Sequence, residues 1–244
     1  MPRVGVLLSG CGVQDGSEIY ETVLTLLALE RGGATVQAMA PDVEQAHIIN
    51  HYTGEESRQQ DGRNVLTEAA RIVRGDIIST HEISAHDLDA LIIIGGFGVT
   101  KNLCNFSTMA EAANVNPDID RLIRELNGLG KPIGAMCAGP ILVALALRGK
   151  DVTMTMGTDG ADMMRLGAHH MVTTVDQAYV DERNNVVSTA AFMLTQSPLE
   201  AEAGINKLVA EVLHRAEALA TGDMTGNTVT ATTGPATTTG PVAI

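Results

Sequence analysis

Short, almost unbroken apolar runs that stop at small residues most constrain the fold of this chain. Residues 4–8 and 91–94 consist almost entirely of branched aliphatic side chains, and residues 132–136 lead directly into Cys137. Such runs are typical of strands buried on both faces of a parallel sheet. Shorter or more mixed runs predict further strands at 34–40, 151–156, 170–175, 177–181 and 186–190.

Helical patterns lie between these strands. Apolar residues recur at helical spacing from residue 19 to residue 28, where Ser17 is a candidate cap and two glycines end the pattern. Further helices are predicted at 64–73, 117–129, 138–147 and 201–219. Alternating strands and helices indicate right-handed βαβ units, and therefore an α/β fold whose mostly parallel sheet carries helices on both faces.

Length and composition predict a single domain over residues 1–219. The chain has 244 residues, of which 45% are hydrophobic, enough for one sizeable core. Residues 220–244 are rich in Thr, Gly and Pro and show no apolar periodicity, so a low-complexity tail is expected there.

The charge and the cysteines exclude several classes of function. A formal net charge of −13 without a basic patch argues against binding of nucleic acid, and the apolar runs are far shorter than the roughly 20 residues of a membrane span. Three scattered cysteines favour reduced thiols over a disulfide framework or a zinc site. We therefore expect a cytoplasmic protein that binds neither nucleic acid nor membrane and uses no metal or other cofactor.

Cys137 is the candidate reactive residue. The strand before it ends at Cys137 and a helix begins within two residues, so the sulfur is expected near backbone N–H groups that favour the thiolate. Ala138 and Gly139 are small enough for a sharp turn of the nucleophile-elbow type. The alternative is a buried core cysteine. Residues 10–21 and 95–102 also lie at carboxyl ends of strands, where ligands bind in such sheets.

The residues around Cys137 resemble a known family. Residues 131–140, Lys-Pro-Ile-Gly-Ala-Met-Cys-Ala-Gly-Pro, resemble the elbow of the class I glutamine amidotransferase-like superfamily, which includes the Parkinson-linked deglycase and the PfpI proteases. Within it, residues 10–18, 95–103 and 186–193 resemble the branch of the isoprenoid-biosynthesis glyoxalase ElbB. The similarity runs from about residue 3 to residue 216. It implies a flavodoxin-like three-layer sandwich with a nucleophile elbow, and a homodimer.

The resemblance also assigns roles to residues. Glu21, in a Tyr-Glu-Thr-Val segment, corresponds to a glutamate that this superfamily places beside the elbow sulfur, with Glu18 as the competing carboxylate. The backbone N–H groups of Gly95, Gly96 and Ala138 are the expected oxyanion and substrate-binding groups.

Histidine is where the sequence departs from the pattern. Amidotransferases of the superfamily use a Cys-His-Glu triad, but residues 152–157 read Val-Thr-Met-Thr-Met-Gly where a histidine is expected. His170, further along the chain, is the candidate base or proton shuttle. The alternative is an inert histidine.

The resemblance implies a cofactor-independent glyoxalase, a lyase that acts through Cys137. Its substrates would be small 2-oxoaldehydes such as methylglyoxal and glyoxal, converted to 2-hydroxy acids without glutathione. One alternative is a redox-responsive stress protein whose thiol is oxidised without turnover of a small molecule. Another is an amidotransferase-like hydrolase that releases ammonia from glutamine, against which the missing histidine argues.

Overall fold

The computed structural model describes residues 1–57 and 62–222. Within this part of the chain a seven-stranded sheet has the strand order β3-β2-β1-β4-β5-β9-β8, and β8 is its antiparallel edge strand. The strands are β1 (Arg3–Leu7), β2 (Thr35–Ala40), β3 (Ile78–Ser79), β4 (Ala90–Ile93), β5 (Ile133–Met136), β8 (Ala178–Asp181) and β9 (Val186–Thr189). The other neighbouring pairs are parallel.

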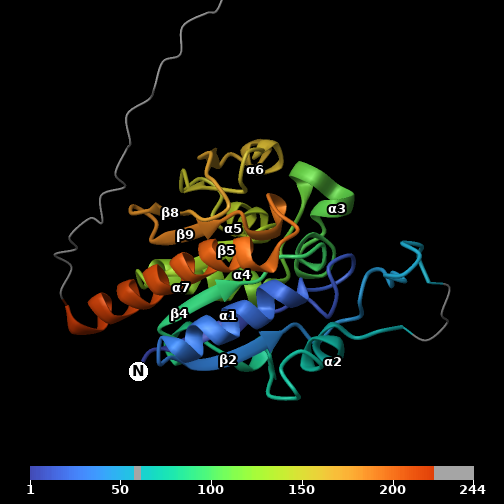
Figure 1. Cartoon of the computed structure of the whole chain (residues 1–244), viewed down its shortest axis with the longest axis horizontal. Coiled ribbons are helices and arrows are strands. Elements are labelled where there is room, and N and C mark those ends of the chain that lie inside the picture. The colour runs from blue at the N-terminus through green and yellow to red at the C-terminus, as the bar shows by residue number, and fades with distance from the viewer. Residues whose placement is uncertain (58–61, 223–244) are drawn as a thin grey trace, which may run out of the picture.

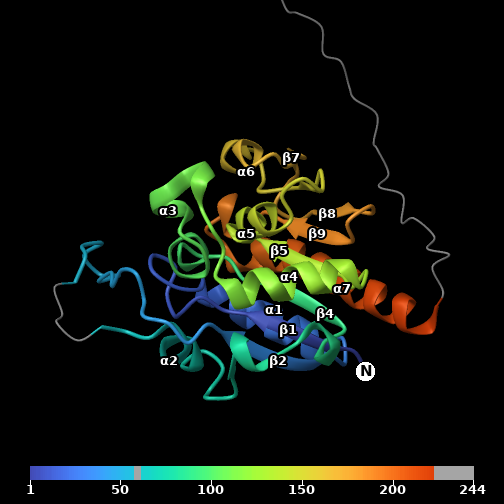
Figure 2. The same cartoon turned by 180° about the vertical axis from the view of Figure 1, so that it is seen from behind.

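Helices cover both faces of this sheet. Helices α1 (Ile19–Arg31) and α7 (Pro198–Thr221) pack together on one face, in front in Figure 1. Helices α4 (Pro117–Gly128) and α5 (Gly139–Ala146) lie on the other face, in front in Figure 2. The shorter helices are α2 (Val65–Ala70), α3 (Phe106–Met109) and α6 (Ala161–Arg165). The predicted α/β architecture, a mostly parallel sheet between two helical layers, is confirmed.

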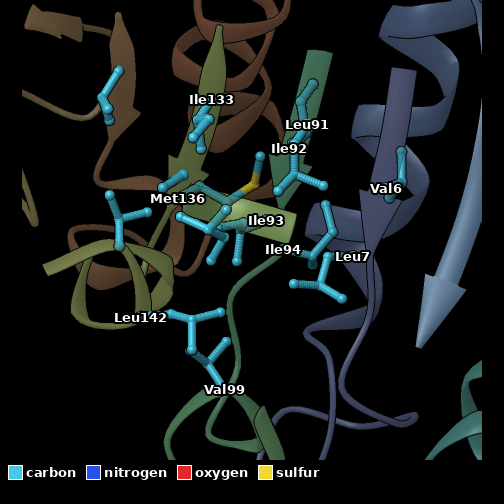
Figure 3. Close-up of a cluster of buried hydrophobic side chains, with 14 of the residues drawn as sticks. Val6, Leu7, Leu91, Ile92, Ile93, Ile94, Val99, Ile133, Met136 and Leu142 are labelled. Atoms are coloured by element: carbon cyan, nitrogen blue, oxygen red, sulfur yellow. The ribbon is translucent and has the colours of Figure 1, made fainter. Parts of the chain in front are cut away.

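The apolar runs of the central strands form the core. Val6, Leu7, Ile92, Ile93 and Ile133 have no exposed surface and belong to one buried cluster that also includes residues of the helices, such as Leu142 of α5 (Figure 3). Burying each such side chain contributes about 1.5–3 kcal/mol relative to leaving it in water. The continuous apolar pattern of these strands therefore reflects burial on both faces.

Two predicted strands are much shorter than expected. β6 (Thr153–Met154) and β7 (His169–His170) pair with each other in a separate two-stranded parallel sheet. Directly after β6, the N–H of Thr155 donates to the hydroxyl of Ser188, 2.9 Å away, so a side chain has replaced the next backbone partner. The chain then turns at Gly157, whose φ is +97°. These two local features end the ladder after two residues.

The start of α1 also differs from the expectation. Glu18 rather than Ser17 is the N-cap, and its carboxylate accepts a hydrogen bond from the N–H of Glu21. The hydroxyl of Ser17 instead accepts a hydrogen bond from the N–H of Ser9 at 2.8 Å. Ser17 therefore fixes the loop after β1, and the charged residue beside it caps the helix.

The carboxyl end of the described chain is helical. α7 begins at Pro198, three residues before the predicted start, and ends at Thr221, with Gly222 in the left-handed conformation. The first residues of the predicted tail thus belong to α7, and residues 223–244 lie outside the described residues. In the part of the chain that the structure covers, no helix is both long and apolar enough to span a bilayer.

Candidate active site

Cys137 occupies a sharp turn between β5 and α5. Its φ is +54°, in the left-handed region that a side chain rarely adopts, while its N–H still donates to the carbonyl of Thr189 at 3.1 Å. Such a conformation costs about 1–3 kcal/mol and persists where the surrounding structure enforces it. Helix α5 starts two residues later, at Gly139. The strain therefore lies at the residue that carries the sulfur.

Glu21 lies next to this turn. It is fully buried on the first turn of α1. Its Oε2 accepts a hydrogen bond from the N–H of Gly95 at 2.9 Å, and its Oε1 accepts a longer one from the N–H of Phe192 at 3.4 Å. The Cys137 thiol lies close to this carboxyl, since a Cβ placed on Gly95 would lie 2.5 Å from Oε2 of Glu21 and 3.0 Å from the Cys137 sulfur. Segments from four parts of the chain thus meet at one carboxyl group.

Gly95 leaves room for this pair. A Cβ placed on Gly95 would lie 2.4 Å from the Cβ of Cys137, 3.0 Å from its sulfur and 2.5 Å from Oε2 of Glu21. Real Cβ atoms do not approach other atoms so closely. Atoms of Cys137 and Glu21 therefore fill the space that a side chain on residue 95 would need, and only glycine fits there.

Two backbone N–H groups face the sulfur. Those of Gly96 and Ala138 both act to lower the pKa of the Cys137 thiol. Gly96 has a φ of +99°, and a Cβ there would lie 2.3 Å from the carbonyl oxygen of Gly16. The residues expected to bind an oxyanion therefore lie together around the thiol.

The electrostatics of the thiol differ from the expectation. Burial, and next the negative charge of Glu18, raise the pKa of Glu21 to about 8, so this carboxyl keeps its proton at neutral pH. Burial raises the pKa of the Cys137 thiol well above its usual value. The expectation that the helix end would lower that pKa was wrong, because burial outweighs the two N–H donors. The resting site holds a thiol beside a protonated carboxyl.

His170 lies on β7, outside the main sheet. Its ring packs over Gly160, where a Cβ would lie 2.2 Å from its Cγ, and its Nε2 is buried without a hydrogen-bond partner among the described residues. In the same part of the chain, no hydrogen bond or ion pair joins His170 to Cys137 or Glu21. Its role as a proton shuttle stays a prediction.

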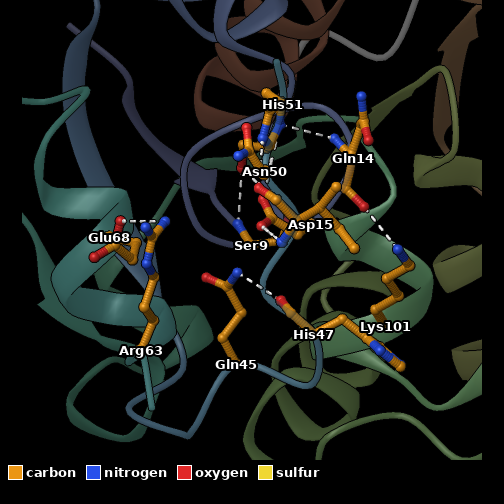
Figure 4. A network of polar contacts seen from close by, with 12 residues as sticks. Ser9, Gln14, Asp15, Gln45, His47, Asn50, His51, Arg63, Glu68 and Lys101 are labelled. Carbon is orange, nitrogen blue, oxygen red and sulfur yellow. Dashed lines mark hydrogen bonds and ion pairs between the residues drawn. The ribbon is translucent and has the colours of Figure 1, made fainter. Parts of the chain in front are cut away.

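A polar network that the sequence pattern did not reveal supports the neighbouring loops (Figure 4). The buried carboxylate of Asp15 accepts a hydrogen bond from the N–H of Ile49 at 2.6 Å. The Asn102 amide donates to the carbonyls of Ser9 and Asp15, each at 2.8 Å, and accepts from the N–H of Ala46. These bonds tie residues 45–49 to the loop after β1. The sequence feature that could have indicated this network is the presence of polar side chains at the carboxyl ends of strands.

The site itself is closed. Cys137 is 7% exposed. Surface hollows of about 300 and 290 Å³ occur elsewhere, and neither is lined by Cys137 or Glu21. Among the described residues, no three His, Cys, Asp or Glu side chains are grouped so that they could hold a metal ion.

The family follows from comparison with known proteins. The model of the DJ-1/PfpI family matches residues 11–197, a span that includes Glu21, Gly95, Cys137 and Phe192. The chain belongs to the DJ-1/PfpI family. The resemblance to the class I glutamine amidotransferase-like superfamily is thereby confirmed.

Relatives share most of their length with this chain. The human glutamine amidotransferase-like class 1 domain-containing protein 3, mitochondrial, is 44% identical over 222 residues, which cover 86% of this chain and 82% of the human protein. The rat ES1 protein homolog, mitochondrial, is 43% identical over 222 residues, with 86% and 83% covered. Both are relatives over nearly the whole domain.

A solved structure supports the fold and the branch. An isoprenoid biosynthesis protein with an amidotransferase-like domain from Ehrlichia chaffeensis superposes with a TM-score of 0.82 at 31% identity. The match covers 88% of this chain and 99% of that protein. Drosophila melanogaster DJ-1beta, at 16% identity and a TM-score of 0.52 over 91% of this chain and 97% of its own, shares the fold. The predicted flavodoxin-like fold is confirmed.

Proposed function

We propose that this chain is a cysteine-dependent, glyoxalase-like enzyme that converts small 2-oxoaldehydes to 2-hydroxy acids without glutathione. The observation that carries the proposal is the buried thiol of Cys137 beside the protonated carboxyl of Glu21, with two backbone N–H groups at the sulfur. Membership of the DJ-1/PfpI family, which includes glyoxalase-type and deglycase-type enzymes, is consistent with it.

The first step would be addition of the thiol to the aldehyde. A bond forms between the sulfur and the aldehyde carbon, and the carbonyl oxygen receives a proton, giving a hemithioacetal. The Glu21 carboxyl donates that proton and becomes a carboxylate, and the S–H proton passes to water. The N–H groups of Gly96 and Ala138 stabilise the negative charge that develops on the substrate oxygen.

The later steps need no external oxidant. The Glu21 carboxylate takes the proton on the former aldehyde carbon and returns it to the neighbouring carbon. The hydroxyl proton of the hemithioacetal moves to the neighbouring oxygen, so one carbon is oxidised as the other is reduced. The product is a thioester of a 2-hydroxy acid. Water cleaves its bond to sulfur, which releases the acid and regenerates the thiol, and the proton that the acid gives up returns to the Glu21 carboxylate.

The enclosure of the site supports a small substrate. With Cys137 only 7% exposed and Glu21 not exposed at all, a long or branched substrate would displace packed residues. Methylglyoxal and glyoxal have two or three carbons and present both reacting carbons within a single bond of each other. Substrates of two or three carbons therefore suit an enclosed site better than longer ones.

The test is turnover of methylglyoxal to lactate, followed by NMR. We expect lactate from the wild-type protein and none from Cys137→Ser, whereas Cys11→Ser and Cys104→Ser should retain activity. Equal turnover by Cys137→Ser would overturn the proposal, and so would ammonia release from glutamine in place of lactate. In His170→Ala, a fall of tenfold or more would support the shuttle role, and unchanged turnover would exclude it.

Oxidation of Cys137 without turnover is the second candidate. The observation that favours it is again the protonated Glu21, which can donate a hydrogen bond to a sulfinate oxygen as well as to a substrate. Mass spectrometry after mild peroxide treatment should then show modification at Cys137 in preference to Cys11 and Cys104. Modification spread evenly over the three thiols would exclude this function.

We also propose that the chain forms a homodimer and that it is located in the cytoplasm, a reducing compartment. All three cysteines are free, which is consistent with a reducing environment. The names of the human and rat relatives place those proteins in mitochondria, so fractionation of the native cells is the test. Light scattering of the purified chain tests the dimer.

A further inference from the structure

A second carboxyl group lies beside Glu21. Glu18 is 8% exposed, and its Oε2 accepts a hydrogen bond from the N–H of Glu21 at 2.6 Å. Burial raises the pKa of this carboxyl, and the N–H groups of Glu21, Tyr20 and Ile19 act to lower it. Within the described residues, neither Glu18 nor Glu21 forms an ion pair with Lys, Arg or His. Two acidic side chains one turn apart thus share a buried site without a compensating cation.

The surroundings of the two carboxyls are unequal. Glu18 is the N-cap of α1, where three N–H groups and the helix dipole stabilise a negative charge. Glu21 lies deeper and accepts two N–H groups, one of them at 3.4 Å. Because two neighbouring carboxyls in a low dielectric do not readily ionise together, the better solvated one takes the charge. Here that carboxyl belongs to Glu18.

We propose that Glu18 is a positioning residue whose fixed negative charge keeps the Glu21 carboxyl protonated and thus able to act as a proton donor. The importance of Glu18 for catalysis rests on the proposed function, but the effect of its charge on the protonation of Glu21 does not. The Glu18 backbone has a related role, because its N–H donates to the carbonyl of Gly95 at 3.0 Å and thereby fixes the strand end beside the thiol.

The groups that face Glu21 are few. On α1 the charged neighbour is Glu18, and on the turn after β5 the titratable neighbour is Cys137. The chain after β4 and the chain after β9 contribute the uncharged N–H groups of Gly95 and Phe192. Removing the charge of Glu18 should therefore make Glu21 easier to ionise, with no other acid in this set to compensate.

The experiment is a pH titration of Glu21 by NMR, in protein labelled with ¹³C at the glutamate carboxyl carbon. The Glu21 resonance is identified by its absence in Glu21→Gln. In Glu18→Gln the amide oxygen still caps α1, but the charge is gone. We expect the midpoint of Glu21 to fall by about one pH unit or more, a tenfold loss of proton affinity.

Matched variants separate charge from structure. Glu18→Asp keeps both the charge and a good cap, so its midpoint should remain near that of the wild type. Glu30→Gln removes a charge from the exposed far end of α1 and should leave the midpoint unchanged. An unchanged midpoint in Glu18→Gln, or an equal fall in Glu18→Asp, would overturn the proposal. The titration needs no substrate, so its result is independent of whether methylglyoxal is turned over.

Discussion

The carboxyl of Glu21 and the sulfur of Cys137 both border the space where a side chain on residue 95 would stand. A Cβ on Gly95 would lie 2.5 Å from Oε2 of Glu21 and 3.0 Å from the sulfur. The N–H of the same glycine also donates to Glu21. Gly95 thus positions the carboxyl through its N–H and leaves room for the thiol and the carboxyl to lie close together. A substitution at this residue therefore tests the site directly.

Gly95→Ala should separate the pair and destabilise the protein. The added methyl group meets the backbone-anchored Cβ of Cys137 at 2.4 Å, and overpacking of this kind costs about 1–3 kcal/mol. We expect a lower midpoint in urea and a large loss of methylglyoxal turnover.

The matched control for Gly95→Ala is Gly128→Ala, at the end of α4. A Cβ there meets nothing within 4 Å, and alanine favours the helix by up to about 1 kcal/mol. Its stability should be unchanged or higher and its turnover normal. Wild-type turnover in Gly95→Ala would contradict the geometry described for the pair.

The raised pKa of Glu21 predicts how stability changes with pH. Its pKa is about 8 in the folded protein against a usual value of 4.5, so between these values the folded chain binds the extra proton. Stability from this proton is fully present below pH 4.5 and is lost as the pH rises through 8. Glu21→Gln, which mimics the protonated acid, should therefore gain about 1.4 kcal/mol per pH unit relative to wild type across that window.

Urea unfolding at several pH values from 5 to 9 measures this difference. Above pH 8 the gain of Glu21→Gln should level off, because both folded and unfolded wild type then carry the charge. The control is Glu30→Gln, on the exposed end of α1, for which the difference from wild type should not depend on pH in this way. A constant difference for Glu21→Gln would mean that Glu21 is already ionised at neutral pH.

Much of the fold was predictable because the central strands are buried on both faces. The apolar runs that became β1, β4 and β5 have no polar face, and this pattern is typical of the middle of a parallel sheet. β3 was not predicted, since its two residues, Ile78 and Ser79, are too few to form a pattern. The shortening of β6 depended on side-chain partners of Thr155 that a local pattern does not contain.

The site was predictable where side chains or glycines carried the signal. Cys137 and the Gly95-Gly96 pair follow from where the strands end, and Glu21 follows from the family resemblance. The N–H of Phe192 left no signal, because any residue supplies a backbone donor. The pKa of the thiol was expected in the wrong direction, since the depth of burial depends on how α1 and β9 pack around the turn.

Glycine in place of Cys137 should relieve the strain of the elbow. The φ of +54° disfavours a side chain, so Cys137→Gly should be more stable than Cys137→Ala by about 1 kcal/mol, although both lack the sulfur. Urea unfolding of the two variants gives the comparison. The same pair of substitutions at the buried Cys104, which has extended backbone, should show the opposite order. If Cys137→Ala were more stable than Cys137→Gly in urea, the turn at residue 137 would not be strained.

Asn102 should be essential for holding the loop after β1. Its buried amide donates to the carbonyls of Ser9 and Asp15 and accepts from the N–H of Ala46, so Asn102→Ala leaves three polar groups without their partner. Each unsatisfied buried group costs about 1–3 kcal/mol, and we expect a total loss above about 2 kcal/mol in urea unfolding. Asn50→Ala is the control, because its bond to the N–H of Tyr52 is exposed and should cost about 0.5 kcal/mol or less. Equal effects of the two substitutions would show that water satisfies the groups around Asn102. In that case the loop would not depend on this amide to stay in place beside the thiol.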